Sequence, residues 1–66
     1  MDIDLEFAIE EIKRIAEEIT GYTFDSISVP ILLSLNPHSR ARVQALCIAV
    51  RALVAMAAIK TFIEHD

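Results

Sequence analysis

The sequence has few of the residues that make turns and cross-links. Its 66 residues include one glycine, two prolines, one cysteine and no tryptophan. A chain so poor in turn-forming residues is biased towards a few long helices. The single cysteine excludes an internal disulfide and fits a reducing compartment. A glycine-rich phosphate loop and the cysteine and histidine spacing of a zinc site are also missing, so no motif names a reaction or a ligand.

Apolar residues, by contrast, are abundant. They make up 55% of the chain, and the formal net charge is −4. Soluble domains usually contain about 45–50% apolar residues even when glycine is counted. A domain of this size buries only about 60% of its unfolded surface, so a lone core is marginal. We therefore expect one domain, residues 1–66, that associates with itself or with a partner protein.

The first half begins with an amphipathic helix. Asp2 or Asp4 is placed to cap it, and Gly21 is the expected left-handed residue after its end. Charged residues occupy one side of the predicted helix, and the other side is a continuous apolar stripe. The stripe contains Leu5, Ala8, Ile9, Ile12, Ile15, Ala16 and Ile19.

The segment 23–35 has two interpretations. Its β-branched residues and partial alternation are compatible with a strand, but the chain has no second strand to pair with. We therefore predict a short helix capped by Asp25, Ser26 or Ser28, with Pro30 in its first turn. Asn36 and Pro37 then suit the N-cap and first position of a third helix.

The third helix is predicted to run from Pro37 to about Glu64. A bulky aliphatic side suits packing against the first helix and contains Val43, Leu46, Val50, Leu53, Val54 and Ala57. A small-residue side allows close approach of another helix, and we expect that helix to be a symmetry mate. The predicted dimer interface is Ala45, Ala49, Ala52, Met56, Ile59, Phe62 and Ile63. The fold class is therefore all-α: a long first, a short second and a long alanine-rich third helix, in a homodimeric bundle.

The apolar run Val43–Ile59 is almost long enough to cross a membrane. Gln44 and Arg51 lie inside it, and an arginine at the centre of a span costs about 2.5–3.5 kcal/mol. The chain also begins MDIDLEF, which is acidic where an export signal is basic. We therefore expect a cytoplasmic protein without a membrane partner.

A few side chains are candidates for contacts with other molecules. Phe7 lies opposite the apolar stripe of the first helix and either packs on a neighbouring element or subunit or anchors a partner. Arg40 and Arg42 lie at the start of the third helix, where the helix dipole disfavours cations. They either pair with the acidic first helix, if the helices run up, down and up, or bind an anion or nucleic acid. His38 and Arg51 complete this candidate contact set.

The runs IKRIAEEITGYTFDSI and SRARVQALCIAVRAL resemble part of the C-terminal DNA-binding domain of bacterial replication initiators. The matching positions between Ile12 and Leu53 are Gly21, Thr23, Ser39, Arg40, Arg42 and Ala45. Residues 29–35 are additional, and the helix-turn-helix that reads DNA in that family has no counterpart after Leu53. The resemblance implies a truncated scaffold in which Arg40 and Arg42 contact phosphates.

An enzyme is the least supported class. Cys47 and His38 are nine residues apart and point to opposite faces of one helix, and Cys47 and His65 are about 27 Å apart along it. Cys47 is expected to be a small buried hydrophobe, and no cofactor is expected. The sequence predicts a non-enzymatic protein that dimerises and binds or regulates a protein partner, with the size of phage or mobile-element inhibitors. The alternative is a DNA-associated accessory protein, which the acidic net charge disfavours.

Overall fold

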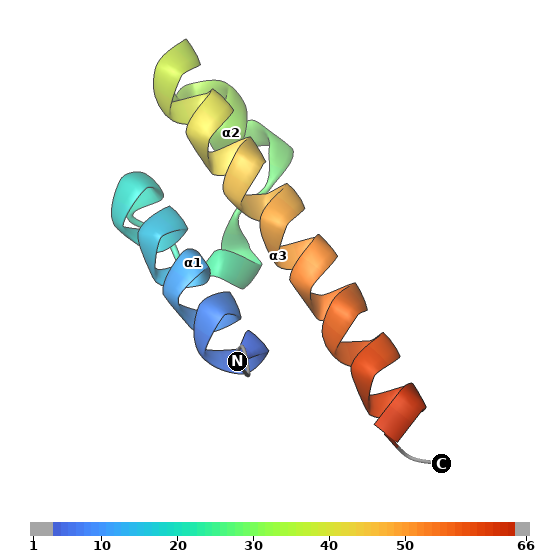
Figure 1. Ribbon diagram of the computed structural model, residues 1–66. Coiled ribbons are helices and arrows are strands. Elements are labelled where there is room, and N and C mark those ends of the chain that lie inside the picture. The colour runs from blue at the N-terminus through green and yellow to red at the C-terminus, as the bar shows by residue number, and fades with distance from the viewer. Residues whose placement is uncertain (1–3, 65–66) are drawn as a thin grey trace.

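The protein is helical throughout the described region. The computed structural model describes residues 4–64, which form α1 (Leu5–Thr20), a 3₁₀ turn η1 (Phe24–Ser26), α2 (Val29–Ser34) and α3 (Pro37–Glu64) (Figure 1). The prediction of an all-α fold with a long, a short and a long helix is confirmed there, and residues 4–64 contain no strand. The alternative cap Asp2 and the separation of Cys47 from His65 fall outside the described residues.

Both ends of α1 follow the local signals in the sequence. The backbone N–H of Phe7 donates to the Asp4 carboxylate at 3.0 Å, which satisfies one free donor of the first turn. At the other end Gly21 adopts a left-handed conformation with φ of 79°, and its N–H donates to the Glu17 carbonyl. This conformation strains residues that carry a Cβ, so glycine is the natural end of the helix.

The segment between α1 and α3 is a turn followed by a short helix, as predicted. Ser28 occupies the position before α2, but its side chain makes no capping hydrogen bond, so the predicted side-chain cap is not found. Pro30 lies in the first turn of α2, where a missing N–H costs least. Glu17 reaches from α1 to accept a hydrogen bond of 2.8 Å from the Phe24 N–H, which fixes η1 to α1. Asn36 caps α3 by accepting from the Ser39 N–H at 2.8 Å.

The two long helices run antiparallel, with α2 beside the first half of α3 (Figure 1). A shallow hollow at the start of α1 is lined by Leu5 and Ala57, which places the first turn of α1 beside the last third of α3. The buried core is small and lies between these helices: Ile9 and Ala16 from α1, Val43 and Val50 from α3.

Two predicted core residues are largely outside this core. Val54 is 51% exposed and Ile15 is 38% exposed, although both belong to the predicted inward sides. A single helix of α1's width covers only a narrow strip of α3, so residues at the margins of each apolar arc remain in water.

The molecule is more extended than a compact domain of its size. Its principal dimensions are 45 × 20 × 18 Å and its radius of gyration is 13.7 Å, whereas a compact chain of this length has a radius of about 11 Å. The solvent-accessible surface is 5114 Å², compared with about 4,200 Å² expected for a folded monomer of this mass. The excess of about 900 Å² is close to one partner's share, about 800 Å², of a standard protein interface.

Candidate interaction surface

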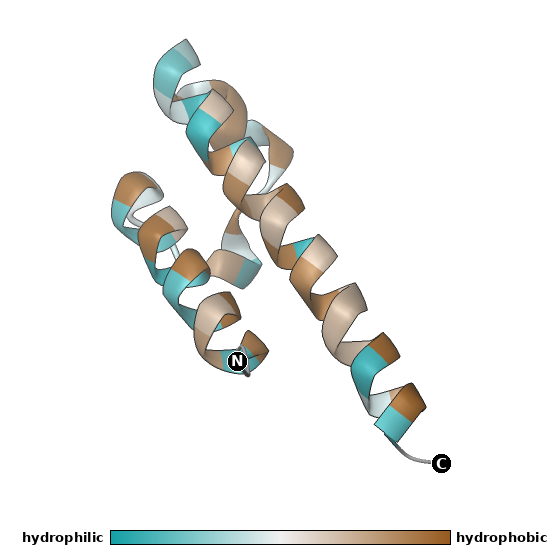
Figure 2. Ribbon diagram, viewed as in Figure 1, coloured by the Kyte–Doolittle hydropathy of each residue, from teal (hydrophilic) through white to brown (hydrophobic). Residues whose placement is uncertain are grey.

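One face of α3 is apolar and open to solvent along its length. Figure 2 shows that hydrophobic residues dominate this helix beyond its first turns. Phe62 is 83% exposed and Ile59 is 59% exposed. Of the seven residues predicted to form a dimer interface, six are exposed: Ala45, Ala52, Met56, Ile59, Phe62 and Ile63. Ala49 is half-buried at the edge of this face, so the predicted surface exists on the protomer, and its occupant stays a prediction.

Sequence reasoning missed two members of this face. Ile48 is 66% exposed and Ala55 is exposed. The predicted interface follows the line of Ala45, Ala49, Ala52 and Met56, and Ile48 and Ala55 lie to one side of that line. The spacing of Ile48 from Ala45 and Ala52, three and four residues, was the signal that places it on the same face.

A groove runs between α2 and α3 at one margin of this face. It has a volume of about 590 Å³ and is lined by Ile27, Ser28, Val29, Leu32, Gln44, Cys47, Ile48 and Arg51. Val29 and Ile48 are each exposed there. Cys47, predicted to be a buried hydrophobe, is only half-buried, because one side of the residue opens into this groove. Apolar walls with a few polar groups at the rim are typical of a binding groove.

Arg40 has a role that neither interpretation predicted. Its Nε donates to the Leu32 carbonyl at 3.0 Å, and its Nη2 donates to the carbonyls of Leu33 and Leu35 at 3.2 and 3.1 Å. These carbonyls lie at the end of α2, where a helix leaves acceptors without intrahelical donors. Arg40 therefore fixes the end of α2 to the start of α3.

Pairing of the arginines with the acidic first helix, one of the two interpretations from the sequence, is not found within the described region. Among residues 4–64, no ion pair joins Arg40 or Arg42 to a carboxylate of α1. The antiparallel packing places Asp4 and Glu6 beside the end of α3 and leaves Glu17 and Glu18 toward its start. Glu17 accepts from the Phe24 N–H and Glu18 lies 3.7 Å from Arg14, so both carboxylates have other partners. The Arg40 guanidinium is bound to the carbonyls at the end of α2 instead.

The other predicted contact residues are scattered. Phe7 is 63% exposed on α1 and so packs on no element of its own protomer to any large extent. His38, Arg42 and Arg51 are exposed along α3, and only Arg51 lines the groove. The structure does not bring these four side chains together into one site.

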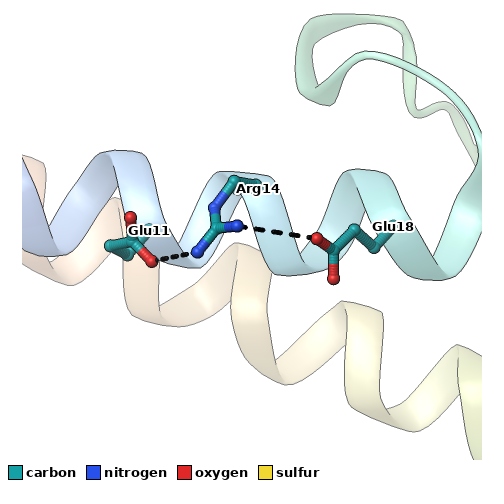
Figure 3. Close-up of polar contacts among 3 residues, drawn as sticks. All are labelled: Glu11, Arg14 and Glu18. Carbon is teal, nitrogen blue, oxygen red and sulfur yellow. Dashed lines mark hydrogen bonds and ion pairs between the residues drawn. The ribbon is translucent and has the colours of Figure 1, made fainter.

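The outer side of α1 carries the clearest electrostatic network. Arg14 donates to Glu11 and lies 3.7 Å from Glu18, so one cation is held between two carboxylates of its own helix (Figure 3). The hydrogen bond to Glu11, followed by the charges of Glu11 and Glu18, raises the pKa of Arg14. All three side chains are well exposed, so the network contributes little to stability.

The same apolar character makes α3 long and hydrophobic enough to cross a membrane. Within the described residues this is the one such helix; its most apolar window has a mean hydropathy of 2.0, and 6% of that window is buried. Core helices of soluble proteins share this length and composition, so the property alone does not assign a location. Across positions 4–64, no group of three potential metal ligands is close enough to hold an ion.

No family model, curated protein or solved structure matches this chain. The resemblance of residues 12–53 to the initiator domain therefore has no matching family behind it.

Proposed function

We propose that this protein is a small, non-enzymatic interaction protein that dimerises through the exposed face of α3 and in that form binds or regulates another protein. The observation that carries the proposal is the open apolar face of α3, with Ile48, Ile59 and Phe62 in water. Contiguous exposed apolar surface of this extent is typical of an interaction site. The excess surface of about 900 Å² is also close to what a stable dimer buries per protomer.

A partner protein is supported by a second exposed residue, Phe7, on the opposite helix. Phe7 is surrounded on α1 by Glu6, Glu10 and Glu11, so it is an apolar anchor within an acidic region. The complementary partner is a basic protein surface with an apolar pocket. Because Phe7 lies on α1 rather than on the open face of α3, both contacts can form at the same time.

Insertion into a membrane fits the structure less well than association with protein. The helix α1 packs along α3 and exposes Glu6, Glu10, Arg14 and Glu18 on its outer side. A bilayer span made by α3 would bring these charges into hydrocarbon or would require α1 to detach. Arg51 would also lie near the middle of the span.

The DNA-associated alternative is less well supported, because one of its two proposed phosphate-binding arginines is bound within the protomer. The Arg40 guanidinium is occupied by three carbonyls of the α2 end, and the net charge is −4. Phosphate binding depends on a concentration of free cations, which the remaining Arg42 and Arg51 do not supply.

Sedimentation across a range of concentrations tests the proposal. We expect a dimer at micromolar concentration that dissociates on dilution. A monomer at all concentrations up to tens of micromolar contradicts self-association. Co-sedimentation with anionic lipid vesicles, or salt-sensitive retention of duplex DNA, would favour the membrane or the DNA function instead.

A further inference from the structure

The exposed residues of α3 form a regular seam. Successive members are alternately four and three residues apart, and all seven are exposed: Ala41, Ala45, Ile48, Ala52, Ala55, Ile59 and Phe62. This is the spacing of the a and d positions of a two-stranded coiled coil. On the opposite side of the helix, Val43, Val50 and Ala57 recur every seven residues and face α1. The seam therefore points directly away from the protomer's own core.

We propose that a second copy of this chain packs on the seam in the antiparallel direction, with Phe62 of each copy against Ala45 of the other. This inference rests on the proposed function of self-association and specifies its geometry. The first support is the uneven size of the seam residues. The start of the seam has Ala41 and Ala45, whereas its end has Ile59 and Phe62.

Antiparallel pairing balances these sizes. When the dyad lies between Leu53 and Val54, Phe62 meets Ala45, Ile59 meets Ile48, and Ala55 meets Ala52, each twice by symmetry. The Phe62–Ala45 pair sets a large residue against a small one at each end of the interface, an arrangement that fills the space between helices at native density. Parallel pairing in register places Phe62 on Phe62 and Ala45 on Ala45, which crowds one end and leaves the other loosely packed.

The position of α2 is the second support. It lies beside the first half of α3 only, so the last half of α3 lacks a second covering helix (Figure 1). In an antiparallel dimer, the end of each α3 lies beside the α2 of the other copy. Phe62, which has the highest exposed fraction of the large hydrophobic residues in 4–64, then reaches the apolar groove at Val29 and Ile48. A parallel dimer leaves both C-terminal halves without this cover.

A pair of matched aspartate variants tests the seam. Ile59→Asp places a charge on the seam, opposite Ile48 of the other copy, whereas Val54→Asp changes a residue of similar exposure on the same helix but off the seam. Sedimentation should show that Ile59→Asp raises the dimer dissociation constant by about a hundredfold or more, because two isoleucines lose their burial in each dimer. Val54→Asp should change it by less than about threefold. Equal effects of the two variants overturn the proposal.

Cysteine cross-linking tests the direction. In a Cys47→Ser background, Ala45→Cys protein mixed with Phe62→Cys protein should give the mixed disulfide dimer, and Ala45→Cys alone should give almost none. Efficient linking of Ala45→Cys alone indicates a parallel dimer and overturns the inference, while self-association stands. If Ile59→Asp leaves the dimer intact, the seam is not the interface, and the inference is overturned while self-association stands. A monomeric wild type overturns both the inference and the proposed self-association.

Discussion

Replacing Arg40 with alanine tests whether one side chain fixes α2 to α3. The guanidinium is half-buried and donates three hydrogen bonds to carbonyls at and just beyond the end of α2. Hydrogen bonds that involve a charged group contribute about 1.5–3 kcal/mol each in favourable surroundings. Here two of the three share one nitrogen and part of the site is open to water, so we expect a total loss of about 1.5–3 kcal/mol rather than a multiple of it.

This loss is large for so small a domain. A chain of this length has a free energy of unfolding of about 3–10 kcal/mol, and each kcal/mol changes the melting temperature of such a domain by about 4–8 °C. Arg40→Ala should therefore lower the melting temperature by roughly 10 °C. The melting temperature of Arg40→Lys should lie between those of the wild type and Arg40→Ala, because an ammonium keeps the charge but does not reproduce the forked donors of the guanidinium.

The assay is thermal and urea unfolding followed by circular dichroism at a fixed protein concentration, because association alters apparent stability. Arg42→Ala is the matched control. Arg42 is the same residue type two positions away, it is exposed, and its side chain makes no hydrogen bond or ion pair among residues 4–64. Its effect should be within about 0.5 kcal/mol. If Arg40→Ala and Arg42→Ala destabilise equally, the attachment of α2 by Arg40 is refuted.

Two further substitutions test the end of α1 and the acidic anchor. Gly21→Ala should lower the free energy of unfolding by about 1–2 kcal/mol, because φ is 79° at this position, although nothing lies within 4 Å of an added Cβ. Gly21→Asn should lower it by less. An unchanged urea midpoint for Gly21→Ala would contradict the backbone strain. Phe7→Asp should weaken the binding of a captured basic partner about tenfold or more in a pull-down titration. Tyr22→Asp, at a similarly exposed aromatic residue, should leave this binding unchanged. Equal loss of binding with both variants would exclude Phe7 as the anchor.

The features predicted correctly from the sequence are those fixed by neighbouring residues. Asp4 and Asn36 cap their helices by bonds to N–H groups three residues away, and Gly21 ends α1 through its own backbone conformation. Pro30 and the lack of a pairing strand sufficed to favour a helix over 29–34. Each of these outcomes depends on a few consecutive residues, so each can be predicted from the local sequence alone.

The features that were predicted wrongly depend on where elements meet. The role of Arg40 required the end of α2 to lie against the first turn of α3, which no local pattern indicates. The arginines do not pair with α1 because Arg40 binds the carbonyls at the end of α2, and the nearest acids of α1, Glu17 and Glu18, bind the Phe24 N–H and Arg14. The exposure of Val54 likewise depends on how much of α3 the shorter α1 covers, and this is a property of the packed pair.

The helix α3 has two apolar faces on opposite sides, and this makes its sequence pattern hard to interpret. Val43, Val50 and Ala57 face α1, and the seam from Ala41 to Phe62 lies on the opposite side. Because its two apolar faces lie on opposite sides, α3 is not amphipathic and resembles a uniformly hydrophobic helix. The helix α1, by contrast, has a single apolar stripe. A helix with one buried and one open apolar face is half-covered in a monomer. The second face therefore accounts for the excess of apolar residues in the composition, and the proposed second copy, with its matching spacing, would remove this face from water.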